Sequence, residues 1–218
     1  MLTILTQRAM KYSLKAGAKT ANRLPWRRAL YFAYGANMDP ENLVKKGIHP
    51  RSSRVAKLDD HELRINVPCE WIGKGFASVS PAPGRVAYGV LHDVSAYELA
   101  LIDVLEWVPF HFHRRVLGKV QTSDGISVSA QYYVASHPTE GLKTSGGYRD
   151  LLVGAALKFQ FSESYVQHLR SLPVGNQFVL DHGFRLSNPE KRRPLESELR
   201  AVYQVHDRAR ERLCQLLP

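Results

Sequence analysis

Residues 31–40 read YFAYGANMDP, and they decide the fold because they predict a buried strand, a tight loop and a helix in succession. The first four residues are aromatic or small and apolar, which is typical of a strand covered on both faces. Gly35 allows backbone freedom or close approach, and Asn37 tolerates left-handed angles. Asp39 suits an N-cap and Pro40 the first helical position. We therefore expect the backbone N–H groups of the loop to point together at a carboxylate or an oxyanion.

The composition is that of an ordinary soluble globular chain of 218 residues, with 44% hydrophobic and 23% charged residues. No apolar run approaches the ~20 residues that span a bilayer, so we expect no membrane partner. Cys69 and Cys214 lack the spacing of metal ligands and indicate free thiols in a reducing compartment. A cytoplasmic location is therefore expected.

The net charge of +10 is concentrated at the N-terminus, where residues 1–30 carry seven Lys or Arg and no Asp or Glu. We expect a solvated basic arm rather than a nucleic-acid-binding segment, although such an arm can bind anionic surfaces. The composition also resembles that of organelle transit peptides, and targeting by the arm is left open. The predicted organisation is a basic arm at 1–29, a domain at 30–178, and a C-terminal loop and helix at 179–218.

Hydrophobic periodicity and turn residues predict an α+β fold. The expected elements are a helix at 40–46, an extended hairpin at 51–67, strands at 73–80 and 86–91 around a turn at 81–85, a helix from 96 to about 106, strands at 110–121 and 126–135 joined by an Asp-Gly turn, and helices at 148–158, 162–172 and 194–217. Ser95 and Glu98 have the spacing of a capping box at the start of the helix expected at 96–106.

Glu106 is the strongest candidate for chemistry. It stands at the predicted end of a helix that Pro109 prevents from continuing, beside the apolar Leu105 and Trp107. A partly desolvated carboxylate suits a general acid or base, and the alternative is a surface glutamate at a helix end. His111 and His113 would share one strand face and, with Glu106, could suggest a zinc site. No further Cys or His cluster supports that site, and we expect no metal; a serine hydrolase is not expected either, because the sequence has no Gly-x-Ser-x-Gly elbow.

Four ordered blocks between about residues 31 and 172 resemble the γ-glutamylcyclotransferase family. The blocks are YFAYGANM at 31–38, VAYGV at 86–90, IDVLEWV at 102–108 and YRDLLVGA at 148–155. The family's usual pattern has Ser where this chain has Ala36, Gly where it has Trp107, and Tyr where it has His113.

The resemblance implies a mixed β-barrel or sheet flanked by helices, with a C-terminal helix. It also implies a cofactor-independent enzyme in which Glu106 is the catalytic acid/base, cyclising a γ-glutamyl amide to 5-oxoproline and releasing an amine. The substrate-binding residues that it implies are Tyr34, Gly35, Ala36, Asn37, Met38, His113 and Tyr148.

The three departures from the family pattern favour a specialised or biosynthetic γ-glutamyl amine or peptide, as in secondary metabolism, over a common dipeptide. A non-catalytic small-molecule-binding or interaction module on the same fold is the alternative, and a homodimer is left open. Glu106 discriminates between the two functions, because a binding module has no need of it.

Overall fold

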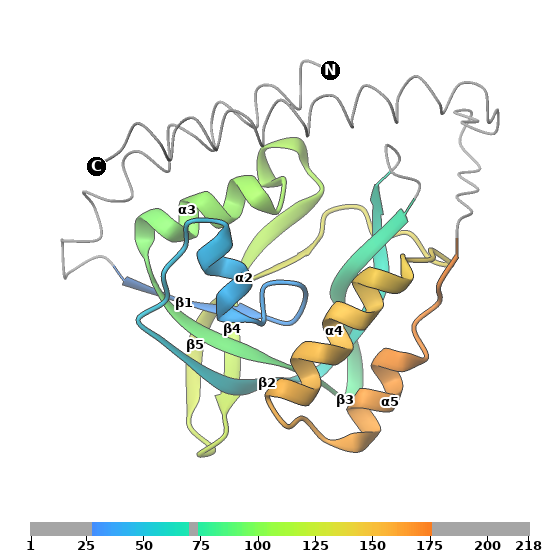
Figure 1. Ribbon diagram of the computed structural model, residues 1–218. Coiled ribbons are helices and arrows are strands. Elements are labelled where there is room, and N and C mark those ends of the chain that lie inside the picture. Colours follow the sequence, from blue (N-terminus) through green and yellow to red (C-terminus); the bar gives the residue numbers. More distant parts are fainter. Residues whose placement is uncertain (1–27, 70–73, 176–218) are drawn as a thin grey trace. The chain divides into compact units, whose positions relative to one another are not determined.

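The computed structural model describes residues 28–69 and 74–175 (Figure 1). The strands are β1 (Arg28–Ala33), β2 (Ser52–Cys69), β3 (Lys74–Ser95), β4 (His113–Thr122) and β5 (Ser127–Ala135); the helices are α2 (Pro40–Lys45), α3 (Ala96–Leu105), α4 (Gly146–Lys158) and α5 (Glu163–Arg170), with a 3-10 turn, η1 (Val108–Phe110). The predicted α+β class is confirmed.

The strands close into a barrel in the order β1-β3-β2-β4-β5. All neighbouring pairs are antiparallel except β1 and β5, which pair in parallel through Tyr31 and Gln131 and so close the barrel. In Figure 1, α4 and α5 lie side by side, α2 follows the loop after β1, and α3, which follows β3, contacts both β1 and β3. The barrel therefore carries helices on its outside, as the sequence predicts.

Buried apolar side chains from the strands and helices form one core cluster. Its fully buried members include Phe32, Leu63, Leu91, Ile102, Leu152 and Leu169. Because β1, β3 and α3 all contribute to this cluster, the loop after β1 and the end of α3 are held by the same packed core.

The hairpin expected at 51–67 is wrong, because these residues belong to one long strand, β2, that pairs with β3 along its length. Asp60 adopts a left-handed φ of 55°, which makes a bulge between the paired residues Asp59 and His61 instead of reversing the chain. Asp60 accepts a hydrogen bond of 2.8 Å from the N–H of Gly84 on β3. The turn expected at 81–85 is the β3 side of the same irregularity, because Asp59 pairs with Val86 and His61 with Pro81, which leaves residues 82–85 opposite Asp60 within one strand, β3.

The helix starts follow their capping residues. The Asp39 side chain accepts from the Glu41 N–H at 3.0 Å at the start of α2, and Ser95 and Glu98 make the predicted capping box of α3. α4 begins two residues earlier than expected, because Ser145 caps it by accepting from the N–H of Tyr148 at 3.1 Å. β4 begins three residues later than expected, because the chain first forms η1.

Residues 1–27 of the predicted basic arm and the helix expected at 194–217 lie outside the described residues, residues 28 and 29 already belong to β1, and the domain boundaries stay predictions. Among the helices that the structure describes, none combines the length and apolar character needed to cross a bilayer.

Candidate functional site

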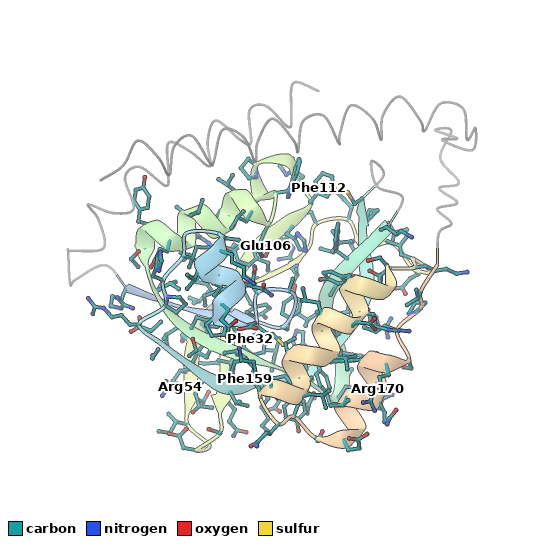
Figure 2. All side chains as sticks on the ribbon, viewed as in Figure 1. Phe32, Arg54, Glu106, Phe112, Phe159 and Arg170 are labelled. Atoms are coloured by element: carbon teal, nitrogen blue, oxygen red, sulfur yellow. The ribbon has the colours of Figure 1, made fainter. Side chains whose placement is uncertain are left out.

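The fold brings Glu106 and the loop after β1 into direct contact, although 69 residues separate them in the chain. Glu106 caps the C-terminus of α3, and its Oε1 accepts a hydrogen bond of 2.7 Å from Nδ2 of Asn37. Figure 2 shows Glu106 beside the loop that leads into α2. The two segments that the sequence selects independently therefore meet at one place.

Asn37 is the central residue of this contact. Its buried carboxamide also donates from Nδ2 to the hydroxyl of Tyr31 at 3.2 Å, while its Oδ1 accepts from Nζ of Lys46. Asn37 does not adopt a left-handed φ, so the backbone tolerance expected of it is not used. What the loop uses is the side chain of Asn37, which links a lysine, a tyrosine and Glu106.

His92 holds the backbone of the same loop. Its Nε2 lies 3.0 Å from the carbonyl oxygen of Asn37, and its Nδ1 lies 2.8 Å from the hydroxyl of Ser53. A carbonyl can only accept, so Nε2 carries the proton and Nδ1 accepts from Ser53. Complete burial lowers the pKa of His92 to about 4, which keeps the ring neutral at physiological pH.

Buried and partly buried tyrosines lie near Glu106. Burial, reinforced by the negative charge of Glu106, raises the pKa of Tyr31, Tyr34 and Tyr148. The hydroxyl of Tyr34 donates to the carbonyl of Tyr133, and the hydroxyl oxygen of Tyr148 accepts from the N–H groups of Ala77, at 3.4 Å, and Ala36. The carboxylate thus lies, partly buried, among neutral phenols, where electrostatic interactions are stronger than in water.

His113 supports the main chain of Glu106. Its Nδ1 lies 2.9 Å from the carbonyl oxygen of Glu106 and 3.7 Å from Oε2 of the same residue. His111 lies elsewhere: it has a left-handed φ of 58° before β4 begins and is exposed, so the two imidazoles do not share a strand face as expected. Across residues 28–69 and 74–175, no group of three His, Cys, Asp or Glu side chains is placed to hold a metal ion.

Trp107 has a left-handed backbone, with φ 56° and ψ 33°, immediately after Glu106. Its ring packs on Phe112, with ring centroids 5.5 Å apart. The chain turns out of α3 at this residue and enters η1, and the same geometry recurs at His111 on the far side of η1. A position that requires positive φ favours glycine, which is the residue that the resembled family pattern has there.

Of the remaining loop residues, Met38 is fully buried, whereas Gly35 and Ala36 are partly buried. The N–H of Met38 donates to the carbonyl of Gly35 at 3.0 Å, and the Met38 side chain is fully buried, so it belongs to the core. A Cβ on Gly35 would lie 3.4 Å from the Tyr148 hydroxyl, which is an ordinary contact. The predicted binding residues therefore lie together around Glu106, and their binding roles stay predictions.

Sequence reasoning missed Lys46, His92 and Tyr31 as parts of this site. His92 carried a usable signal, because a titratable residue stands inside the buried run of 86–94. The sequence gives no such signal for Lys46, since lysines are common at helix ends.

Comparisons with known proteins agree with this arrangement. The sequence profile of the AIG2-like family matches residues 86–169. The chain is 25% identical to a Bos taurus γ-glutamylcyclotransferase over 148 residues, which are 66% of this chain and 78% of that protein. It is 24% identical to the Homo sapiens γ-glutamylcyclotransferase, again over 148 residues that cover 66% of this chain and 78% of that protein.

Solved structures share the fold. A γ-glutamyl cyclotransferase structure superposes with a TM-score of 0.61 at 20% identity, covering 78% of this chain and 99% of that one. The protein YkqA from Bacillus subtilis superposes with a TM-score of 0.60 at 20% identity, covering 74% of this chain and 60% of that one. The resemblance that the sequence shows is therefore confirmed.

Proposed function

We propose that this γ-glutamylcyclotransferase-like chain is a cofactor-independent enzyme that cyclises a γ-glutamyl amide to 5-oxoproline and releases an amine. In this proposal Glu106 is the general acid/base, and the loop after β1 binds the substrate. The observation that carries the proposal is the hydrogen bond of 2.7 Å from Asn37 to Glu106, which joins the proposed binding loop to the proposed catalytic group.

Two of the three proton transfers in the proposed reaction are assigned to Glu106. Its carboxylate takes a proton from the substrate's α-ammonium group, and the freed nitrogen forms a bond to the γ-carbonyl carbon of the same molecule. Protonated Glu106 then donates to the leaving nitrogen as the bond between that nitrogen and the γ-carbon breaks, and the ring nitrogen gives up its second proton to the departing amine. Because the attack is intramolecular, correct folding of the substrate removes much of the entropic barrier.

The developing negative charge on the γ-carbonyl oxygen needs donors. The N–H of Met38 is used within the loop, and that of Ala36 contacts the Tyr148 hydroxyl. The proposal therefore assigns charge stabilisation to the N–H groups of Gly35 and Asn37, and to the Tyr148 hydroxyl proton. Fixed donors of this kind commonly give the largest single contribution to catalysis.

The proposed substrate is a specialised or biosynthetic γ-glutamyl amine or peptide. Trp107 and His113 lie next to Glu106 and differ from the family pattern, so the walls around the reacting atoms differ as well. Glutathione and common γ-glutamyl dipeptides are the natural comparison substrates.

The test is a screen of γ-glutamyl amines and peptides for release of 5-oxoproline, followed by Glu106→Gln on the best substrate. The amide keeps an oxygen for the Asn37 contact but cannot shuttle a proton, so turnover should fall by roughly 10²–10⁴-fold while the melting temperature stays unchanged. Glu140→Gln, at an exposed position, is the matched control and should retain full activity. Full activity in Glu106→Gln would refute the mechanism, and substrate binding without any turnover would favour the non-catalytic binding module.

A further inference from the structure

Lys46 is the cation closest to the carboxamide that holds Glu106. It is the C-cap of α2, and its side chain reaches back to the loop, where Nζ donates to Oδ1 of Asn37. Its neighbour Lys45 is exposed instead. The loop, α2 and Lys46 thus form one local unit around Asn37.

The direction of each hydrogen bond in this unit follows from chemistry. An ammonium group can only donate, so the oxygen of the Asn37 carboxamide faces Lys46. The NH2 end must then face Glu106 and Tyr31, to which it donates at 2.7 and 3.2 Å. Because an NH2 group has no acceptor, Oε1 of Glu106 must accept, which is the arrangement that suits an ionised carboxylate.

We propose that Lys46 is a positioning residue for Glu106, acting through the Asn37 carboxamide. Its ammonium fixes the orientation of the amide, and the amide in turn orients the carboxylate of Glu106 and favours its proton-accepting form. The inference rests on the proposed function and adds a residue to its machinery.

Electrostatics agree with this geometry. Burial lowers the pKa of the Lys46 ammonium, and the charge of Glu106 opposes that shift, so the two groups are coupled. Within the described part of the chain, Glu106 also interacts with five titratable groups: Tyr31 from β1, Tyr34 from the loop, His113 from β4, Tyr133 from β5 and Tyr148 from α4. The four phenols are neutral, so Lys46 and His113 are the groups of this set that can bring positive charge.

Substitution of Lys46 by Met removes the charge and keeps most of the side-chain volume. The carboxamide of Asn37 is then free to rotate and present its oxygen to Glu106, which favours the protonated carboxyl. We expect kcat to fall by roughly ten- to a hundredfold, with KM little changed. Lys46→Arg keeps a cation and should restore much of kcat, whereas Lys45→Met should match the wild type.

The side-chain amide resonances of Asn37 give a second readout that needs no turnover. Their assignment follows from their loss in Asn37→Asp, and their chemical shifts should change in Lys46→Met, because the amide loses its fixed orientation, and return toward the wild-type values in Lys46→Arg. Asn37 resonances that respond in this way, in a protein that turns over no γ-glutamyl substrate, would refute the proposed function alone. A Lys46→Met variant with unchanged kcat and unchanged Asn37 resonances would refute the positioning role, and a change in KM alone would make Lys46 a substrate ligand instead.

Discussion

The left-handed backbone at Trp107 allows a prediction that depends on the fold alone. A non-glycine residue in this conformation costs roughly 1–2 kcal/mol, and glycine avoids that cost but loses about 0.4–1 kcal/mol through its more flexible unfolded chain. Both Trp107→Gly and Trp107→Ala also lose the ring contact with Phe112, worth about 0.5–1.5 kcal/mol. We therefore expect Trp107→Gly to be more stable than Trp107→Ala by about 0.5–1 kcal/mol.

Urea unfolding of the two variants measures this difference directly, because both lack the same ring. The corresponding gap in melting temperature is a few degrees, since about 1 kcal/mol shifts a chain of this size by roughly 2–4 °C. Leu151, half-exposed inside α4, is the control position: there Gly should be less stable than Ala by about 1 kcal/mol. Equal stability of the two Trp107 variants, with the expected order at Leu151, would refute the argument from backbone strain.

Two further predictions concern stability. Gly89→Ala should destabilise the fold by about 1–3 kcal/mol, because its Cβ would lie 2.7 Å from the ring of Phe32 and against the carbonyl of Ala33; in Gly154→Ala, where nothing lies within 4 Å, thermal melts should instead show a gain of about 1 kcal/mol. The second follows from the pKa of His92, which is about 4 when folded against 6.5 unfolded. Above pH 6.5 the ring is neutral in both states, and as the pH falls toward 4 only the unfolded state takes up the proton, so about 3 kcal/mol of stability is lost across that window. His92→Gln should flatten this part of the stability profile, and an equally steep acid loss in that variant would contradict the assignment.

The sequence was most informative where local chemistry decides the structure. The caps at Asp39 and Ser95 and the Asp-Gly turn between β4 and β5 depend on neighbouring residues, and all three are confirmed. The predictions failed where the structure depends on strand pairing with residues that are distant in the sequence. The bulge at Asp60 is stabilised by the N–H of Gly84, 24 residues away, and no local pattern distinguishes such a bulge from a turn.

The same division holds for the candidate site. Glu106 and the loop could each be selected from the sequence, and the order of the motifs indicated that they meet. The partners of Asn37 could not be predicted, because Lys46, His92 and Tyr31 reach it from three different elements. Such contacts depend on how the barrel closes and how α2 packs, which hydrophobic periodicity does not encode.

Trp107 and His113, the two residues beside Glu106 that differ from the family pattern, do not take part in the hydrogen bond between Asn37 and Glu106. His113 hydrogen-bonds the backbone carbonyl of Glu106, and Trp107 keeps the left-handed exit from α3 while its ring packs on Phe112. Neither replaces the donor at Oε1, which is Asn37. Substitutions around Glu106 that leave its carboxylate in place change which molecule fits beside the carboxylate. They have less effect on the ability of the carboxylate to transfer a proton. Under the proposed function, we therefore expect a change of substrate: the order of rates across the γ-glutamyl amine screen should shift in Trp107→Gly, and Glu106→Gln should abolish turnover in that variant as well.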